Sequence, residues 1–388
     1  MASRDILSTE YLKDFLNANI FLFITFPDCS AEGKQMPDLL TESPESIVTS
    51  LYRLLLWREP GSHEVSHYAE ALRTHRFTPQ QLAREFALSN EFMGLGSEPA
   101  RTVRVAAMGC IFLLPEGFAV IDELQAASGY EPWVLPYFLE CCRPGMTVLD
   151  IGASIGAFAL PAAKRVTSKG RVYAFEAGPV NCRLLARSAK ASGLANLHLL
   201  AFGASDALGV DFMRRQGFTS NNVMAGAHRV DVDNLDAYDV VPVQPIDLLR
   251  PALGAVHVIK MDIEGMEYKA TLGAMALIRE SRPVVFCEYS PQFQKHGSAV
   301  DGRELLGTYL DLGYQVEILH RNKPREAVLP GDTSAAVEHV TRAWEHHVRE
   351  DSGTHLDLCF RPVVSGQPSG NAPSRRGFLS RQAGRNGR

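Results

Sequence analysis

The sequence lacks the features that define several common classes of protein. Its seven cysteines are an odd number and contain no C-x-x-C pair, which argues against a disulfide framework and against a zinc site. We therefore expect reduced and mostly buried thiols. Basic residues are not in excess either. The formal net charge is −5, so no overall basic field favours a nucleic-acid partner.

Long apolar runs are also missing. The apolar stretch at 20–26 is much too short to cross a bilayer, and no secretory signal pattern is present. We expect a cytoplasmic protein without a membrane span. What remains is the composition of an ordinary globular protein, 46% hydrophobic and 21% charged over 388 residues, which allows one to three domains.

One stretch organises the chain. An apolar strand pattern at 148–151 runs into a glycine turn at 152–156, and a helix pattern follows at 158–166. A second strand pattern, 171–175, ends in Glu176. Glycines allow close approach of a ligand, a helix N-terminus offers free N–H groups, and the terminal acid can accept hydrogen bonds from ribose hydroxyls. The pattern predicts one half of a nucleotide-binding fold.

Strand and helix patterns alternate from residue 148 onward, which favours a parallel sheet covered by helices on both faces. The predicted strands are 148–151, 171–175, 197–202, 256–261, 283–287, 315–319 and 356–361. Their count and alternation fit an α/β fold with the seven-stranded, Rossmann-like sheet of class I methyltransferases. The pattern leaves the order of the strands open.

Four segments are predicted along the chain. Residues 1–42 are an N-terminal extension without an assigned role, and residues 43–97 are a helical module. The α/β domain spans 98–364, and a tail with five arginines and no acid spans 365–388. The composition of the tail predicts that it is disordered. The irregular segment 209–239 is predicted to contain a hairpin.

The helical module begins at a helix start signal, Ser43-Pro44. Its run LYRLLLWREP at 51–60, with the closing SNEF at 89–92, resembles a small helical domain of unknown function with the pattern LYRxxLxRxPD…SxEF. Gly61 stands where that domain usually has Asp. The resemblance implies a docking role, with a protein partner bound through this module. A generic helical bundle packed on the α/β domain is the alternative.

Three motifs of the α/β domain together resemble the FkbM family of methyltransferases. They are DxGAxxG at 150–156, YAFEAGPxN at 173–181 and IKMDIEGxE at 259–267. The element YEP at 130–132, which contains Glu131, is similar to the family as well. The resemblance covers roughly residues 110–362. It implies S-adenosylmethionine (SAM) as the cofactor and methylation of hydroxyls on polyketides, sugars or other small molecules.

Strand ends supply the candidate cofactor residues, because ligands of open sheets bind there. Asp150 can orient the turn or bind the amino group of the cofactor, Glu176 can accept both ribose hydroxyls, and Ser205 with Asp206 can meet the adenine edge. Alternatively, Asp150 is an acid that only stabilises the turn, and Glu176 is a solvated residue at the end of a strand. The full candidate set is Glu131, Asp150, Gly152, Ala153, Gly156, Glu176, Ser205 and Asp206.

The candidate catalytic residues cluster at the end of the fourth predicted strand. Alternation puts Lys260 and Asp262 on one side of it, and an alcohol acceptor needs a group that handles its proton. Asp262 is the first candidate, followed by Glu264 and Lys260. Glu288 can join them, and three carboxylates can bind a divalent cation. We expect no metal, because no histidine is spaced with them. Alternatively, Lys260 and Glu267 form a structural pair.

We therefore expect a SAM-dependent methyltransferase that acts on a hydroxyl of a sugar, glycan or other small molecule. A catalytically idle binding protein with the same fold is one alternative, in which the helical module is the working part. An NAD-dependent oxidoreductase is the other. The G-x-x-x-G turn counts against the latter, since dinucleotide-binding turns have the spacing G-x-G-x-x-G.

Overall fold

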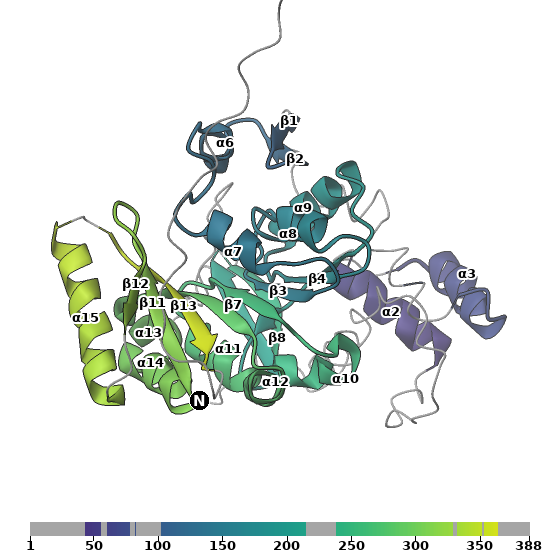
Figure 1. Cartoon of the computed structure of the whole chain (residues 1–388). Helices are drawn as coiled ribbons and strands as arrows, with labels where there is room; N and C mark the ends of the chain where they lie inside the picture. Colours follow the sequence, from purple (N-terminus) through teal and green to yellow (C-terminus); the bar gives the residue numbers. More distant parts are fainter. Residues whose placement is uncertain are drawn as a thin grey trace, which may run out of the picture.

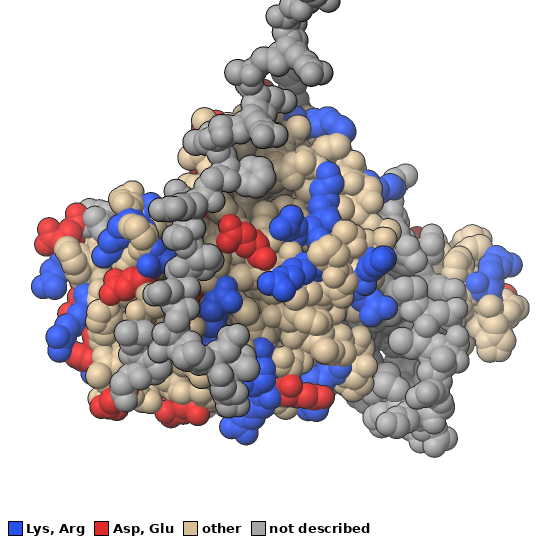
Figure 2. All heavy atoms as spheres, viewed as in Figure 1, with Lys and Arg blue, Asp and Glu red and all other residues tan. Residues whose placement is uncertain are grey.

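The computed structural model of the chain describes residues 43–55, 60–77, 82, 102–214, 238–328, 332–350 and 353–363. The predictions of an N-terminal extension, of the SNEF motif and of a disordered tail lie outside these residues. No helix in the described ranges is long and apolar enough to cross a membrane. Basic and acidic side chains both occur on the face shown in Figure 2.

An eight-stranded sheet forms the centre of the protein, in the order β12-β11-β13-β10-β9-β3-β4-β5 (Figure 1). Five neighbouring strands are parallel: β10 (Val284–Tyr289), β9 (Val258–Met261), β3 (Thr147–Ile151), β4 (Arg171–Phe175) and β5 (Leu197–Leu200). The remaining three are antiparallel to their neighbours: β13 (Leu356–Pro362), β11 (Tyr314–Leu319) and β12 (Glu326–Val328).

All seven predicted strands are present, and the class I methyltransferase sheet is confirmed. The structure adds their order, with β13 inserted between β10 and β11. The short edge strand β12 was not predicted, because three residues carry no readable periodicity.

Helices cover both faces of the sheet (Figure 1). One face packs against α6 (Val120–Gln125), α7 (Leu135–Cys141), α8 (Ala159–Val166), α9 (Pro179–Ala191) and the hairpin of β1 (Thr102–Ala107) and β2 (Cys110–Pro115). The other packs against η3 (Ile246–Leu249), α10 (Arg250–Leu253), α11 (Glu267–Gly273), α12 (Met275–Ser281), α14 (Gly302–Asp311) and α15 (Thr333–Glu350). Helix α13 (Pro291–Gly297) follows β10. Strand alternation therefore divides the core into two apolar clusters.

A second, three-stranded sheet follows β5. It consists of β6 (Gly203–Ala204), β7 (Gly209–Arg214) and β8 (Tyr238–Gln244), in the order β6-β8-β7. Strands β7 and β8 pair antiparallel, as the predicted hairpin requires. The sequence pattern at 267–279 favours a single helix, whereas in the structure α11 ends at Gly273 and α12 begins after Ala274. A Cβ on Gly273 would lie 1.9 Å from the Ser205 carbonyl oxygen, so the small sheet packs closely against this break.

Two N-terminal helices, α2 (Pro44–Leu55) and α3 (Ser62–Arg73), lie on the opposite side of the molecule from α15 (Figure 1). They pack against each other, with the rings of Tyr52 and Tyr68 6.3 Å apart and an ion pair between Arg73 and Glu45. Helix α2 begins at Pro44, in agreement with the predicted start signal. The resemblance of the module and its protein partner stay predictions.

Candidate active site

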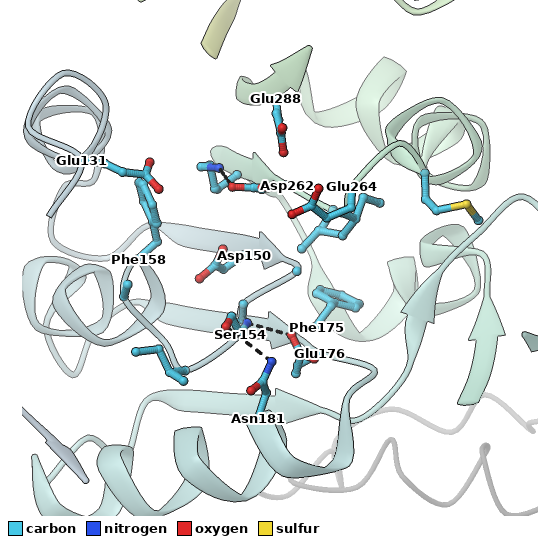
Figure 3. Close-up of a pocket in the computed structure, with 18 of the residues that line it drawn as sticks. Glu131, Asp150, Ser154, Phe158, Phe175, Glu176, Asn181, Asp262, Glu264 and Glu288 are labelled. Atoms are coloured by element: carbon cyan, nitrogen blue, oxygen red, sulfur yellow. Dashed lines mark hydrogen bonds and ion pairs between the residues drawn. The ribbon is translucent and has the colours of Figure 1, made fainter. Parts of the chain in front are cut away.

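A cavity of about 590 Å³ opens at the carboxyl ends of the parallel strands (Figure 3). The turn after β3, the end of β4 and the end of β9 all contribute to it, because parallel strands finish at the same edge of a sheet. A volume of this size accommodates a cofactor-sized ligand. Most of the predicted site residues line it: Glu131, Asp150, Gly152, Ala153, Glu176, Lys260, Asp262 and Glu264.

Three predicted cofactor residues do not line the cavity. A Cβ on Gly156 would lie 2.3 Å from Leu185 Cδ1, so this glycine serves the packing of the turn against α9. Ser205 and Asp206 follow strand β6 of the small sheet, and the Ser205 N–H donates to the Gln244 carbonyl at 3.1 Å. Their placement does not support the predicted contact with an adenine edge. The neighbouring residues that do line the cavity are Phe202, Gly203 and Ala204.

The turn after β3 needs its glycine for a reason that the sequence did not reveal. Gly152 has φ +83°, and a Cβ there would lie 1.9 Å from the carbonyl oxygen of Asp262. The close approach of the end of β9 therefore excludes a side chain at this position. Ser154 also has a positive φ of 49°, which is uncommon for a residue with a Cβ.

Glu176 holds this turn in place. Its Oε2 accepts the Ser154 N–H at 2.8 Å (Figure 3). Its Oε1 accepts the Gly178 N–H at 2.7 Å. Burial raises the pKa of Glu176, and these two N–H groups oppose the shift. Each carboxylate oxygen can accept a second hydrogen bond, so capacity remains for the hydroxyls of a ligand in the cavity.

Asp150 offers the cavity an unused acceptor. It is 2% exposed and lies in register with Lys260 of the neighbouring strand. Its Oδ2 has no hydrogen-bond partner among the described residues. Burial raises the pKa of Asp150 to about 7, against the opposing charge of Lys260. A buried oxygen without a partner costs free energy, which a ligand that donates hydrogen bonds would recover.

We expect Asp150→Asn to change the pH dependence of stability. The pKa of folded Asp150, about 7, lies above its unfolded value of about 4. The stability that the bound proton contributes is therefore complete below pH ~4 and lost as pH rises through 7. Asparagine has no such proton, so the variant should gain stability relative to wild type between pH 5 and pH 8. Urea unfolding without cofactor measures this, and an equal difference at both pH values would contradict it.

Lys260 is a buried cation at the centre of the site. Its Nζ lies 2.8 Å from Asp262 Oδ2 and 4.8 Å from the ring centroid of Phe158. Burial lowers the pKa of Lys260, but the charges of Asp262, Glu131 and Asp357 outweigh this effect and raise it. Lys260 is therefore charged and cannot accept a proton. It stabilises the negative charge of Asp262 instead.

The alternative pairing of Lys260 with Glu267 is wrong. The Glu267 carboxylate is 1% exposed, and its Oε1 accepts the N–H groups of Ile263 at 3.0 Å and Gly265 at 3.2 Å. Glu267 thus fixes the loop that follows β9. This role is structural, and it sets the position of Glu264 between those two residues.

The carboxyl groups of Asp262, Glu264 and Glu288 point into the same part of the cavity (Figure 3). Burial would raise the pKa of Asp262, but Lys260 holds it well below its usual value. Burial and the charge of Asp262 raise the pKa of Glu288 far above its usual value. Burial also raises the pKa of Glu264, to about 7. Asp262 is thus the charged member of the group, while Glu288 keeps a proton and hydrogen-bonds to Asp262. No described cluster of His, Cys, Asp and Glu is arranged to hold a metal ion.

One wall of the site was not predicted from the sequence. Because β13 runs antiparallel beside β10, its first residues lie at the carboxyl edge, and Asp357 is in register with Glu288. His355 Nδ1 lies 2.9 Å from Glu288 Oε1, and Trp133 Nε1 donates to Asp357 Oδ2 at 2.7 Å. Arg321, which follows β11, lines the same wall. The only available signal was the direction of the last strand, which depends on a strand order that the pattern left open.

The sheet order and the acid-lined cavity at its carboxyl edge define a class I methyltransferase fold. Within it, residues 150–316 match the family model described as the methyltransferase FkbM domain. The match contains the turn after β3, Glu176 and the Lys260–Asp262 pair. SAM is the methyl donor of this class of domain.

The chain is also similar to solved structures of methyltransferases. Methyltransferase FkbM from Methylobacillus flagellatus is 20% identical with a TM-score of 0.33, and the match covers 58% of this chain and 50% of that one. A SAM-dependent methyltransferase from Aquifex aeolicus is 15% identical with a TM-score of 0.31, and the match covers 60% of this chain and 89% of that one. Aeropyrum pernix fibrillarin with natively bound SAM is 12% identical with a TM-score of 0.31, and the match covers 57% of this chain and 68% of that one. The chain thus spans half the length of the FkbM structure. No curated protein matches it.

Proposed function

We propose that this protein transfers a methyl group from SAM to a hydroxyl of a sugar, glycan or other small molecule. The observation that carries the proposal is the convergence of Asp150, Glu176 and the Lys260–Asp262 pair on one cavity at the carboxyl edge of the sheet. The preference for a sugar or glycan acceptor rests on the helical module alone. The domain of unknown function that this module resembles is often attached to glycosyltransferases and other surface-polysaccharide proteins.

The residues present fit this cofactor. Asp150 Oδ2 is an acceptor for the ammonium group, and the Glu176 carboxylate has capacity for two ribose hydroxyls. The cavity is lined by eight acidic residues against the basic residues Lys260 and Arg321, which favours a cationic ligand. When bound, SAM supplies a methyl group on a positively charged sulfur.

The charge of the lining also weighs against an NAD-dependent oxidoreductase. The pyrophosphate of NAD is anionic, and the acidic lining would repel it. The turn after β3 lacks the further glycine that lets a backbone approach a pyrophosphate. An idle methyltransferase fold is the remaining alternative, and only a transfer assay separates it from the enzyme.

Two measurements test the proposal. Calorimetric titration should give heat for SAM and none for NAD, and the reverse result would refute the cofactor assignment. Incubation with methyl-labelled SAM and separate pools of sugars, glycans and other small molecules should then label one pool. If SAM binds but no pool is labelled, the idle fold is favoured.

A cytoplasmic location is part of the same proposal. The six described cysteines are all free, and five of them are buried. Free thiols are typical of a reducing compartment. The docking role of residues 43–97 stays a prediction, which deletion of the module in a binding assay with extract proteins would test.

A further inference from the structure

The protonation state of His355 follows from its hydrogen-bond partners. Its Nε2 lies 3.1 Å from Arg321 Nη2. A guanidinium has only N–H donors, so Nε2 must accept this hydrogen bond with its lone pair. The proton of the neutral ring therefore resides on Nδ1, which lies 2.9 Å from Glu288 Oε1 and 3.3 Å from the hydroxyl oxygen of Thr354. His355 thus presents an unprotonated nitrogen on the wall of the cavity, where its side chain is 25% exposed.

Charged groups on several elements face this imidazole. Asp357 of β13 lies 3.9 Å from Nε2, and the charges of Asp262 and Lys260, at the carboxyl end of β9, also act on the ring. Burial lowers the pKa of His355, the two acids oppose this shift, and Arg321 and Lys260 add to it. The net shift is downward, so the ring is neutral near pH 7.

We propose that His355 takes the proton from the acceptor hydroxyl, and that Glu288 is the positioning residue that holds it in the required tautomer. This inference rests on the proposed function. Three neighbouring groups are unsuited to the task, whereas Glu264, whose pKa burial raises to about 7, also lines the cavity. Lys260 is charged, Asp262 is committed to Lys260 at 2.8 Å, and Glu288 already holds a proton.

The position of His355 between two cavities supports this role. A second cavity, of about 770 Å³, lies between α15 and the segment that follows β11. It shares Arg321, His355 and Asp357 with the cofactor cavity. His355 would therefore lie between an acceptor bound in the second cavity and a cofactor bound in the first cavity. Arg321 is exposed, so the acceptor hydroxyl can replace it on Nε2.

The acceptor oxygen forms a bond to the methyl carbon while the carbon–sulfur bond breaks, and that electron pair goes to sulfur, which becomes a neutral thioether. The hydroxyl proton moves to Nε2 of His355 and then to water. Base catalysis of this kind typically contributes about 10²–10⁴-fold to the rate.

The first test is independent of the acceptor. Nitrogen NMR of the full chain with labelled histidine, compared with His355→Gln, identifies the resonances of His355. We expect an unprotonated Nε2 at pH 7.5 and a pKa below the usual histidine value. Glu288→Gln should preserve the tautomer, because its amide donates to Asp262 and accepts from Nδ1 as protonated Glu288 does. Glu288→Leu leaves only the Arg321 hydrogen bond to Nε2 and should raise the population of the other tautomer. A proton on Nε2 in the wild type would overturn the proposal.

The second test uses transfer of labelled methyl groups to a defined mixture of methyl glycosides. At saturating SAM, His355→Gln should lower kcat by about 10²–10⁴-fold and weaken the fall in rate at acid pH. Calorimetric SAM affinity should be unchanged, as should the rate of the control His296→Gln, an exposed histidine on α13. A wild-type rate and pH profile in His355→Gln would overturn the role of His355. If the wild type binds SAM but labels no sugar, the sugar acceptor is wrong, and the NMR result alone decides the inference.

Discussion

Replacing Glu176 with alanine should weaken SAM binding on the order of 100-fold. Two ribose hydroxyls would each lose a hydrogen bond to a charged acceptor, at about 1.5 kcal/mol or more per bond. A total of about 3 kcal/mol corresponds to roughly two powers of ten in affinity. The same substitution frees the Ser154 and Gly178 N–H groups, so the turn after β3 also loses the contact that orders it. Calorimetry measures the affinity.

The matched control is Asp206→Ala. Asp206 was predicted at the cofactor as Glu176 was, but it is exposed and does not line the cavity. Its replacement should leave the SAM affinity unchanged. An unfolding curve for each variant separates lost affinity from lost structure. An unchanged affinity in folded Glu176→Ala would show that the ribose assignment is wrong.

Lys260→Met should lower the free energy of unfolding by about 3 kcal/mol, because removal of one partner leaves buried carboxylates without their counter-charge. Lys260 is 1% exposed, and its charge acts on Asp262, Glu131 and Asp150. The pKa of folded Asp262 is lowered, so the stability it contributes is present above its unfolded value of about 4 and lost as pH falls. The difference between variant and wild type should therefore be largest near pH 7.

Denaturant unfolding at pH 7 and pH 3.5 measures this effect. Lys295→Met, an exposed lysine on α13, is the control and should change stability by no more than about 0.5 kcal/mol. If Lys260→Met is as stable as this control at pH 7, the Lys260–Asp262 pair does not stabilise the fold.

The first half of the site could be predicted because it is local. Asp150, Gly152 and Glu176 occupy one strand–turn–helix–strand unit, and each follows a strand pattern that a short window reveals. The pairing of Lys260 with Asp262 also follows from strand alternation. The reason for Gly152 did not follow, because its neighbour Asp262 is more than a hundred positions away in the chain.

The second half depends on strand order and direction. His355 and Asp357 begin a strand that runs opposite to β10, so they lie at the edge where the other strands end. Alternation of apolar and polar residues reports which side of a strand is buried, but not which strand lies beside it. The same limit explains why Ser205 was predicted at the cofactor. Its strand end was taken to belong to the main sheet, whereas the chain enters a separate sheet at β6.

The contact between Gly152 and the Asp262 carbonyl has a consequence for how the enzyme would work. With no room for even a methyl group between them, the cofactor turn and the acidic strand end cannot move independently. The distance between the turn that would bind the methyl donor and the strand end that would bind the acceptor is then set when the chain folds, before either ligand binds. Such preorganisation saves the cost of aligning two groups at the moment of reaction. Variation among acceptors would accordingly come from the α15 side, where the second cavity is lined by exposed residues such as Arg321 and Lys323.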